Sequence, residues 1–192
     1  ATGTNQSCYD VAKALALYFS EFLTGQFANN WIEFNKSAKL HTWNGNNVLE
    51  KWYNDKTSCI GTTDFQSVFD LLVSIKQSGV PESDFPTGIL CISDSEFNPT
   101  TLGTTNVDAA RRKLRSAGFS DSFVENFRIV LWNLQSRYYG AGTGEKFETS
   151  AWEKGTSYFS GFSPSVISFL TGVPEETPRD IFDKAMNQEV LN

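Results

Sequence analysis

Apolar residues recur along the chain at two spacings, one typical of helices and the other typical of strands. In the segment 8–23, Val11, Leu15, Phe19 and Phe22 are three or four residues apart, which predicts a helix with an apolar face. Further apolar side chains widen this face, so we expect the helix to be well buried. The same spacing predicts helices over 48–53, 64–75, 107–117, 164–170 and 178–186.

Short apolar runs between these helices predict strands. Residues 88–93 include Ile89, Leu90, Cys91 and Ile92 in succession, a pattern typical of a strand buried on both faces of a parallel sheet. A turn at 35–37 joins two further segments, 27–34 and 38–43, into a predicted hairpin. The remaining predicted strands cover 127–134 and 155–159, and a glycine-rich loop covers 138–148.

Strands that alternate with amphipathic helices predict an α/β fold. We expect a doubly wound, mostly parallel open sheet with helices on both faces. The length of 192 residues suits one domain, and the sequence contains no internal repeat and no long linker. We therefore expect a single domain over 1–192, in which 175–192 form a helical tail.

The charge of the chain disfavours a nucleic-acid partner. Sixteen Lys and Arg residues against 22 Asp and Glu residues give a net charge of −6. Proteins that bind nucleic acids usually carry a basic face that displaces counterions from the phosphates. The densest basic run, 111–113 with Arg115, spreads around a predicted helix and reads as a solvated surface.

The cysteines and the hydropathy favour an intracellular protein without a membrane span. Three cysteines with no close pairing give no disulfide framework, and Cys91 lies inside an apolar run. This usage suits a reducing compartment, so we expect a cytoplasmic location, or the virion if a phage encodes the protein. The longest apolar-rich stretch, 11–22, is too short for a membrane helix.

Two oxygen-bearing residues follow the pattern of a metal site. Thr63 precedes a predicted helix, and Asp94 directly follows the apolar strand 88–93. Ligands bind at the carboxyl ends of the strands in doubly wound sheets, and hard oxygen ligands suit Mg²⁺. Each residue alone also has a structural explanation, since Thr63 or Asp64 can cap the helix and Asp94 can be a polar strand end.

Three motifs resemble a family of poorly characterised proteins with a von Willebrand factor A (vWA)-like domain. The motifs are the segments 63–66 (Thr-Asp-Phe-Gln), 132–134 (Trp-Asn-Leu) and 160–163 (Ser-Gly-Phe-Ser). Relatives of this kind occur in cellular genomes and in phages, and their domain is similar to the A domain of Ro-type RNA-binding proteins. The resemblance runs from about Cys8 to Leu170.

The resemblance implies a metal-ion-dependent adhesion site, in which Thr63 and Asp94 match two of the ligands. The main part of such a site is an Asp-x-Ser-x-Ser loop after a central first strand, and this sequence does not contain it. A central parallel strand pairs with both neighbours, so its loss would leave unpaired backbone groups and a cavity. We therefore expect an upstream segment or another polypeptide to supply this strand. Two protein oxygens alone would hold Mg²⁺ weakly.

These features predict a protein–protein interaction module rather than an enzyme. The resemblance implies that a carboxylate of the partner protein completes the coordination of Mg²⁺. The alternative is a metal-independent structural or assembly protein, such as a component of a phage particle. A hydrolase that uses Asp94 with Glu96 is a further alternative. Against an enzyme, His41 is the single histidine and lies in a predicted strand, and the segment 140–144 lacks the ending of a phosphate-binding loop.

Overall fold

The computed structural model describes the residues 7–57, 64–93, 96–97, 105–134, 145–146 and 154–161. For the short segments 96–97 and 145–146 it describes the backbone alone. All described residues fall within the unit Ala1–Gly161. The two helices predicted within 162–192, including the tail 175–192, lie outside the described residues.

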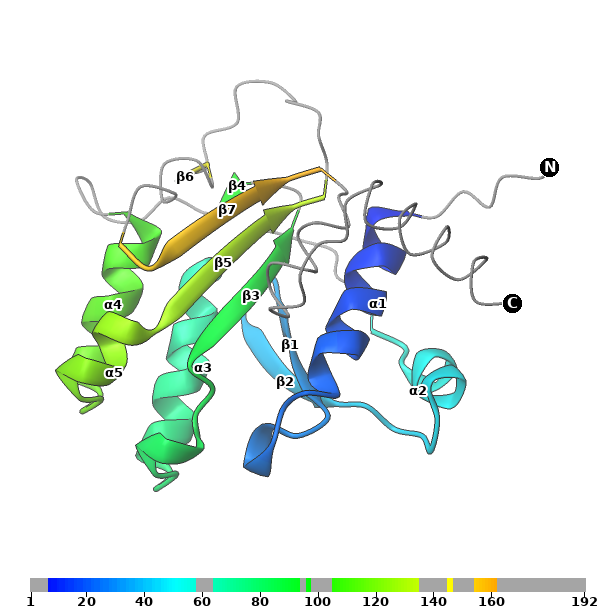
Figure 1. The fold of residues 1–192 in the computed structure, drawn as a ribbon, viewed down its shortest axis with the longest axis horizontal. Helices are drawn as coiled ribbons and strands as arrows, with labels where there is room; N and C mark the ends of the chain where they lie inside the picture. The colour runs from blue at the N-terminus through cyan, green and yellow to red at the C-terminus, as the bar shows by residue number, and fades with distance from the viewer. Residues whose placement is uncertain are drawn as a thin grey trace, which may run out of the picture. The chain divides into compact units, whose positions relative to one another are not determined.

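Three parallel strands form the main sheet. These are β3 (Gly88–Ser93), β5 (Arg128–Asn133) and β7 (Thr156–Ser160), in the order β3-β5-β7. The register places the last residues of the three strands, Ser93, Asn133 and Ser160, opposite one another. Each strand agrees within one or two residues with an apolar run in the sequence, so the predicted parallel α/β character is confirmed (Figure 1).

Two further pairs of strands are antiparallel. The predicted hairpin consists of β1 (Asn30–Phe34) and β2 (Ala38–Thr42), with Trp31 opposite His41. It forms a separate two-stranded sheet, which Figure 1 shows on the side of β3 away from β5. The pair β4 (Glu96–Phe97) and β6 (Glu145–Lys146) was not predicted, because two residues are too few to show a strand pattern.

The helices begin at polar caps, of which the sequence analysis named only the cap of α3. Ser7, Asp64, Thr105 and Ser120 each accept a hydrogen bond from a backbone N–H in the first turn of the helix that follows. The helices are α1 (Cys8–Ser20), α2 (Val48–Asn54), α3 (Phe65–Gln77), α4 (Asn106–Ser116) and α5 (Asp121–Asn126). Single turns of 3₁₀ helix lie at Gly25–Phe27 and Glu82–Asp84.

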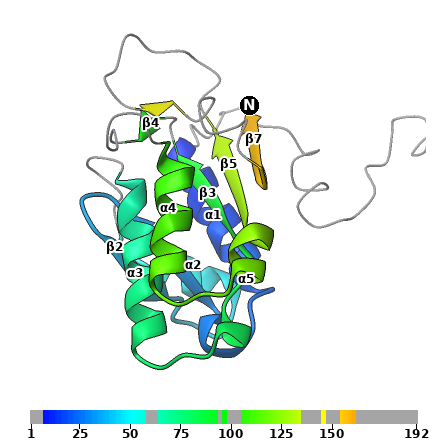
Figure 2. The same cartoon turned by 90° about the vertical axis from the view of Figure 1, so that its left-hand side faces the viewer.

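The core lies between the sheet and the pair of helices α3 and α4, which Figure 2 shows side by side on one face of the sheet. Phe69, Leu114, Ile129 and Leu131 are inaccessible to solvent, and Cys91 joins the same cluster. Fully burying an aliphatic or aromatic side chain contributes about 1.5–3 kcal/mol, so these contacts fix the sheet against the two helices.

Two elements are less buried than their sequences predict. Tyr18 in α1 is 44% exposed, Phe22 just after the helix is 63% exposed, and only three residues of α1 are buried, so the prediction of a well-buried helix is wrong. Among the described elements, the helix packs mainly along β1 and α2. In β3 only Cys91 is buried, because β3 lies at the edge of its sheet. No helix in the described part of the chain is long and apolar enough to cross a membrane.

Candidate functional site

Both predicted metal ligands, Thr63 and Asp94, lie outside the described residues. Their neighbours in the sequence, Asp64 and Ser93, are described. The carboxyl ends of β3, β5 and β7 meet at one edge of the sheet, and we refer to this edge as the carboxyl edge. Because Asp94 directly follows the last residue of β3, the carboxyl edge is the part of the structure in which the predicted site can be examined.

Asp64 rather than Thr63 is the N-cap of α3. Its carboxylate accepts hydrogen bonds from the backbone N–H groups of Gln66 and Ser67, at 3.1 and 3.3 Å. Its own N–H donates to the carbonyl oxygen of Asn35 in the hairpin turn, at 3.0 Å. Of the two caps that the sequence allowed, the structure uses Asp64, and the cap therefore does not require the Thr63 hydroxyl.

The half-buried amide of Gln66 and the buried Asn106 join the beginnings of α3 and α4. The amide nitrogen of Gln66 donates to the backbone carbonyl of Asn106 at 2.8 Å and to its side-chain oxygen at 3.0 Å. Asn106 is fully buried, and the Oε1 atom of Gln66 is buried without a hydrogen-bond partner in the described part of the chain. These contacts hold the N-termini of two helices together, where helix dipoles favour oxygen ligands with negative charge.

The end of β7 is fixed against the end of β5. The indole N–H of Trp132 donates to the carbonyl oxygen of Gly161, and the N–H of Gly161 donates to the carbonyl oxygen of Asn133, both at 2.8 Å. Gly161 has a φ of 83°, a conformation that glycine adopts without strain. The fully buried Trp132 ring thus anchors the turn that follows β7.

The carboxyl edge therefore presents neutral oxygen atoms on a fixed backbone. The strand ends carry hydroxyl and amide side chains, which are hard ligands of the type that Mg²⁺ accepts. Among the described residues no three His, Cys, Asp or Glu side chains gather into a possible metal site. The residues present fit a weakly held Mg²⁺ only if Thr63 and Asp94 contribute their oxygens.

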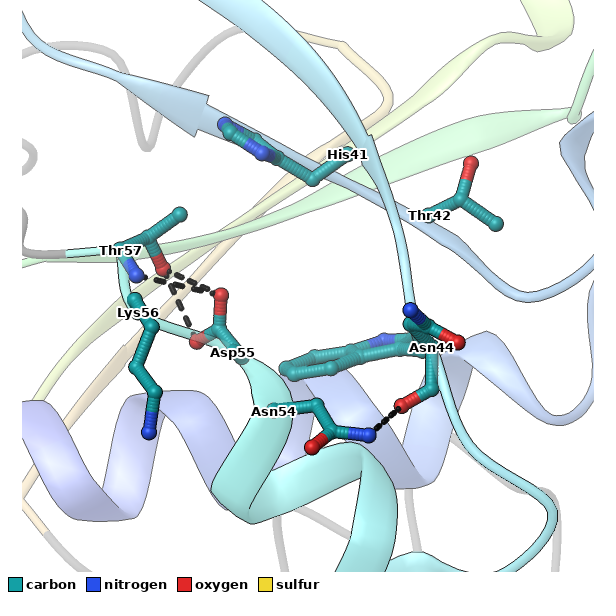
Figure 3. A pocket seen from close by; sticks show the side chains of 8 residues that line it. His41, Thr42, Asn44, Asn54, Asp55, Lys56 and Thr57 are labelled. Carbon is teal, nitrogen blue, oxygen red and sulfur yellow. Dashed lines mark hydrogen bonds between the residues drawn. The ribbon is translucent and has the colours of Figure 1, made fainter.

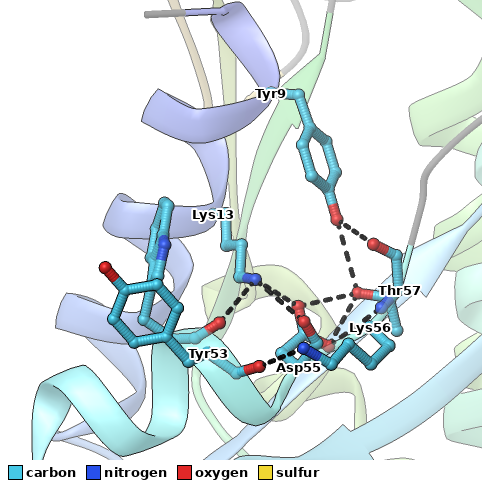
Figure 4. A network of polar contacts seen from close by, with 7 residues as sticks. Tyr9, Lys13, Tyr53, Asp55, Lys56 and Thr57 are labelled. Atoms are coloured by element: carbon cyan, nitrogen blue, oxygen red, sulfur yellow. Dashed lines mark hydrogen bonds and ion pairs between the residues drawn. The ribbon is translucent and has the colours of Figure 1, made fainter.

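A polar network that the sequence did not predict joins α1 to the segment after α2 (Figure 4). The ammonium of Lys13 lies 2.9 Å from a carboxylate oxygen of Asp55 and also donates to the carbonyl oxygen of Trp52 at 2.9 Å. The Thr57 hydroxyl donates to both oxygens of Asp55, and the Tyr9 hydroxyl donates to the Thr57 carbonyl at 2.7 Å. The one sequence feature that could have indicated this network is Lys13, a charged residue inside an otherwise apolar helix.

The network also sets the charge state of Asp55. Burial alone would raise the pKa of this carboxyl group, but hydrogen bonds from Lys13 and Thr57 and the positive charge of Lys13 outweigh burial. The pKa of Asp55 is therefore below its ordinary value. The network thus ties Asp55 and Thr57 to α1.

A shallow pocket of about 270 Å³ lies beside this network (Figure 3). It is bounded by the end of β2 and by the residues that follow α2. Asn54 donates to the carbonyl oxygen of Asn44 at 2.9 Å and so ties the two walls together. His41 contacts Glu33 at 2.9 Å and stacks on Trp31, which gives this histidine a structural role in the hairpin. The lining residues are His41, Thr42, Trp43, Asn44, Asn54, Asp55, Lys56 and Thr57.

Comparison with known proteins gives a family and one distant relative. A family described as "Domain of unknown function (DUF7788)" matches residues 1–190. The chain is also similar to "Uncharacterized protein L728" of Acanthamoeba polyphaga mimivirus, with 23% identity over 192 residues. This alignment covers 95% of the chain and 31% of the viral protein, so the chain spans about a third of that relative. No solved structure matches the chain.

Proposed function

The chain belongs to the DUF7788 family, and we propose that it is a protein–protein interaction module that binds its partner at the carboxyl edge of the sheet. One observation carries this proposal. Ser93, Asn133 and Ser160 end three parallel strands in register. Open α/β sheets bind their ligands at this position. The side chains of these three strand ends are neutral, which suits recognition better than acid–base chemistry.

We propose further that the fold is of the doubly wound vWA type. The order of elements supports this proposal, because a hairpin and α3 precede β3, and α4 and β5 follow it. The free buried thiol of Cys91 suits a reducing compartment such as the cytoplasm, or a virion assembled there.

In this proposal Thr63 and Asp94 hold Mg²⁺ at the carboxyl edge. The use of Asp64 as the helix cap supports a role for Thr63, because its hydroxyl is not needed for capping. When bound, Mg²⁺ supplies positive charge that attracts a carboxylate of the partner protein. The chain itself has a net charge of −6, which disfavours an acidic partner without such an ion.

Titration with Mg²⁺ alone tests the metal part of the proposal. We expect isothermal titration calorimetry to detect weak binding to the wild-type chain and none to Thr63→Val or Asp94→Asn. Ser83→Ala serves as the control, since Ser83 is exposed in the 3₁₀ turn Glu82–Asp84 and is neither of the proposed ligands. If the wild-type chain does not bind Mg²⁺, the metal-independent structural role replaces the adhesion site.

Cross-linking in the native source tests the interaction itself. Lys36 lies in the hairpin turn whose Asn35 bonds to the cap of α3, whereas Lys154 lies before the amino end of β7. Both lysines are exposed, so they react similarly with a lysine cross-linker. We expect cross-links from a partner protein to Lys36 but not to Lys154. Equal cross-linking of both lysines would contradict binding at the carboxyl edge.

A further inference from the structure

Of the asparagines in the sequence, Asn44 alone is directly followed by glycine. The pair Asn44–Gly45 lies between β2 and α2, in a segment that is neither helix nor strand. Asn44 is exposed and lines the shallow pocket beside the ion-pair network (Figure 3). Water can therefore reach the side-chain amide of Asn44.

This pair of residues is chemically reactive. The backbone nitrogen that follows an asparagine can attack the side-chain carbonyl carbon of that asparagine. Most residues hinder this attack with their Cβ atom, which glycine lacks. Among the described residues, neither the N–H of Gly45 nor the side-chain amide of Asn44 has a hydrogen-bond partner, so no such contact has to break first. Only the backbone carbonyl of Asn44 is held, by the amide of Asn54 at 2.9 Å.

The fold requires glycine at position 45. Its φ of 147° lies in a region that residues with a side chain rarely adopt. A Cβ atom at this position would also lie 2.6 Å from the Cβ atom of Glu50 and 2.7 Å from the backbone nitrogen of Lys51, both in α2. The close packing of Gly45 against α2 thus explains why the chain has a reactive Asn-Gly pair at this place.

We propose that Asn44 is a site of spontaneous deamidation and that its isoaspartate product loosens α2. The nitrogen of Gly45 forms a bond to Cγ of Asn44 and closes a cyclic succinimide. The side-chain nitrogen of Asn44 leaves as ammonia, together with the proton that the Gly45 nitrogen gives up. Water then adds to one of the two carbonyl carbons of the ring and opens it, which yields aspartate or isoaspartate. No atom is oxidised or reduced.

The two products differ in their backbone. Both add one negative charge at neutral pH, because the ordinary pKa of such a carboxyl group is about 3.9. In isoaspartate the chain also runs through the former side chain, so it is one carbon atom longer. Since Gly45 already lies against Glu50 and Lys51, the longer backbone has to displace the beginning of α2. The carbonyl that Asn54 contacts becomes a free carboxylate, so the connection between β2 and α2 changes as well.

Incubation of the full, folded chain in mildly alkaline buffer tests the site. Samples are digested at intervals, mass spectrometry locates each converted asparagine, and chromatography separates aspartate from isoaspartate. Asn46 is the internal control, because it is exposed in the same segment but is followed by Asn47. We expect Asn44 to convert about tenfold faster than Asn46, a ratio that corresponds to a difference of about 1.4 kcal/mol in activation free energy.

Two variants separate the reaction from its consequence. Asn44→Gln keeps a neutral amide on a longer side chain that closes the ring much more slowly, so we expect no conversion at this position. Asn44→Asp supplies the new charge on a normal backbone. Hydrogen exchange of the α2 amides should become faster in the incubated wild-type chain, in proportion to its isoaspartate content. The incubated Asn44→Gln chain and the fresh Asn44→Asp chain should exchange like the fresh wild-type chain.

Three results would overturn the proposal. The first is conversion of Asn44 no faster than that of Asn46. The second is conversion of Asn44 only after unfolding in urea, because the fold would then protect the pair. The third is unchanged exchange of the α2 amides in the isoaspartate form, which would contradict the loosening of α2. Should Asn44→Gln fail to fold, the comparison of the fresh and incubated wild-type chains decides alone.

Discussion

Lys13 and Asp55 form an ion pair across 2.9 Å in which their side chains are only 9% and 10% exposed. The pair connects the middle of α1 to the segment that follows α2, and the Lys13 ammonium also lies 4.7 Å from the centre of the Trp52 ring. Breaking a buried pair by removing one partner leaves a charge without its counterion. The pair therefore makes the docking of α2 on α1 sensitive to a single substitution.

We predict that Lys13→Met lowers the free energy of unfolding by about 3 kcal/mol, the cost typical of an orphaned buried charge. Urea denaturation followed by circular dichroism measures this change. Arg112→Met is the matched control, because Arg112 pairs with Asp108 at the surface and is 61% exposed. Exposed pairs contribute about 0.2–1 kcal/mol, so a similar loss in both variants would contradict a special role for Lys13.

The double variant Lys13→Met with Asp55→Asn separates charge from packing. Replacing both partners removes the orphaned charge. We therefore expect the double variant to lose less free energy of unfolding than the sum of the losses in Asp55→Asn and Lys13→Met alone. Strict additivity of the two losses in the same urea experiment would mean that the two side chains act independently.

Acid should weaken the fold through Asp55. The pKa of Asp55 in the folded chain is below its value in the unfolded chain, which is about 3.9. A lowered folded pKa contributes stability above the unfolded pKa and loses it as the pH falls through the folded value. We predict that the free energy of unfolding falls below about pH 4, and that Asp55→Asn shows a smaller fall.

Other carboxylates account for the fall in the free energy of unfolding at low pH that remains in Asp55→Asn. Hydrogen bonds from Ser7 and Ser120 lower the pKa of Asp10 and Glu82, and the hydrogen bond from Lys154 lowers that of Glu125. These three groups also favour the folded chain above their unfolded pKa values. An unchanged acid response in Asp55→Asn would therefore assign the whole effect to the exposed carboxylates.

Local sequence patterns predicted the elements with a clear period. The three sheet strands and the hairpin were predicted from apolar runs and turn residues. The helices α3 and α4 were predicted from their apolar spacing, and α3 also from its polar cap. These patterns depend only on residues close together in the sequence, so they can be interpreted without knowledge of the tertiary contacts. The six-residue α5 was missed because its length is less than two helical turns.

Features that depend on residues far apart in the chain could not be predicted from the sequence. The ion pair of Lys13 with Asp55 joins residues 42 positions apart, and the contact of Gln66 with Asn106 joins residues 40 positions apart. The exposure of Phe22 depends on which elements pack around α1, which no local pattern states. At the candidate site, the sequence allowed two caps for α3, and only the backbone geometry at Asp64 decides between them.

Gly88 allows β3 to approach β5 closely. A Cβ atom at this position would lie 2.4 Å from the backbone oxygen of Arg128, which cannot move without breaking the ladder. We predict that Gly88→Ala lowers the free energy of unfolding by about 1–3 kcal/mol, as overpacked sites do. For a chain of this length each kcal/mol lowers the Tm by about 2–4 °C, which calorimetry resolves. Thr87→Ala, at the exposed preceding residue, should leave the Tm nearly unchanged.

The cysteines report whether β3 stays in place. Cys8 is exposed at the start of α1, whereas Cys91 is 5% exposed and burial raises the pKa of its thiol. Iodoacetamide reacts with the thiolate, so we predict that mass spectrometry of digests finds Cys8 modified in the native chain. Cys91 should react only after unfolding in urea, which is the control for its intrinsic reactivity. If Cys91 reacted in the native chain as fast as Cys8, β3 would have to detach from α3 and α4, and the core described above would not persist in solution.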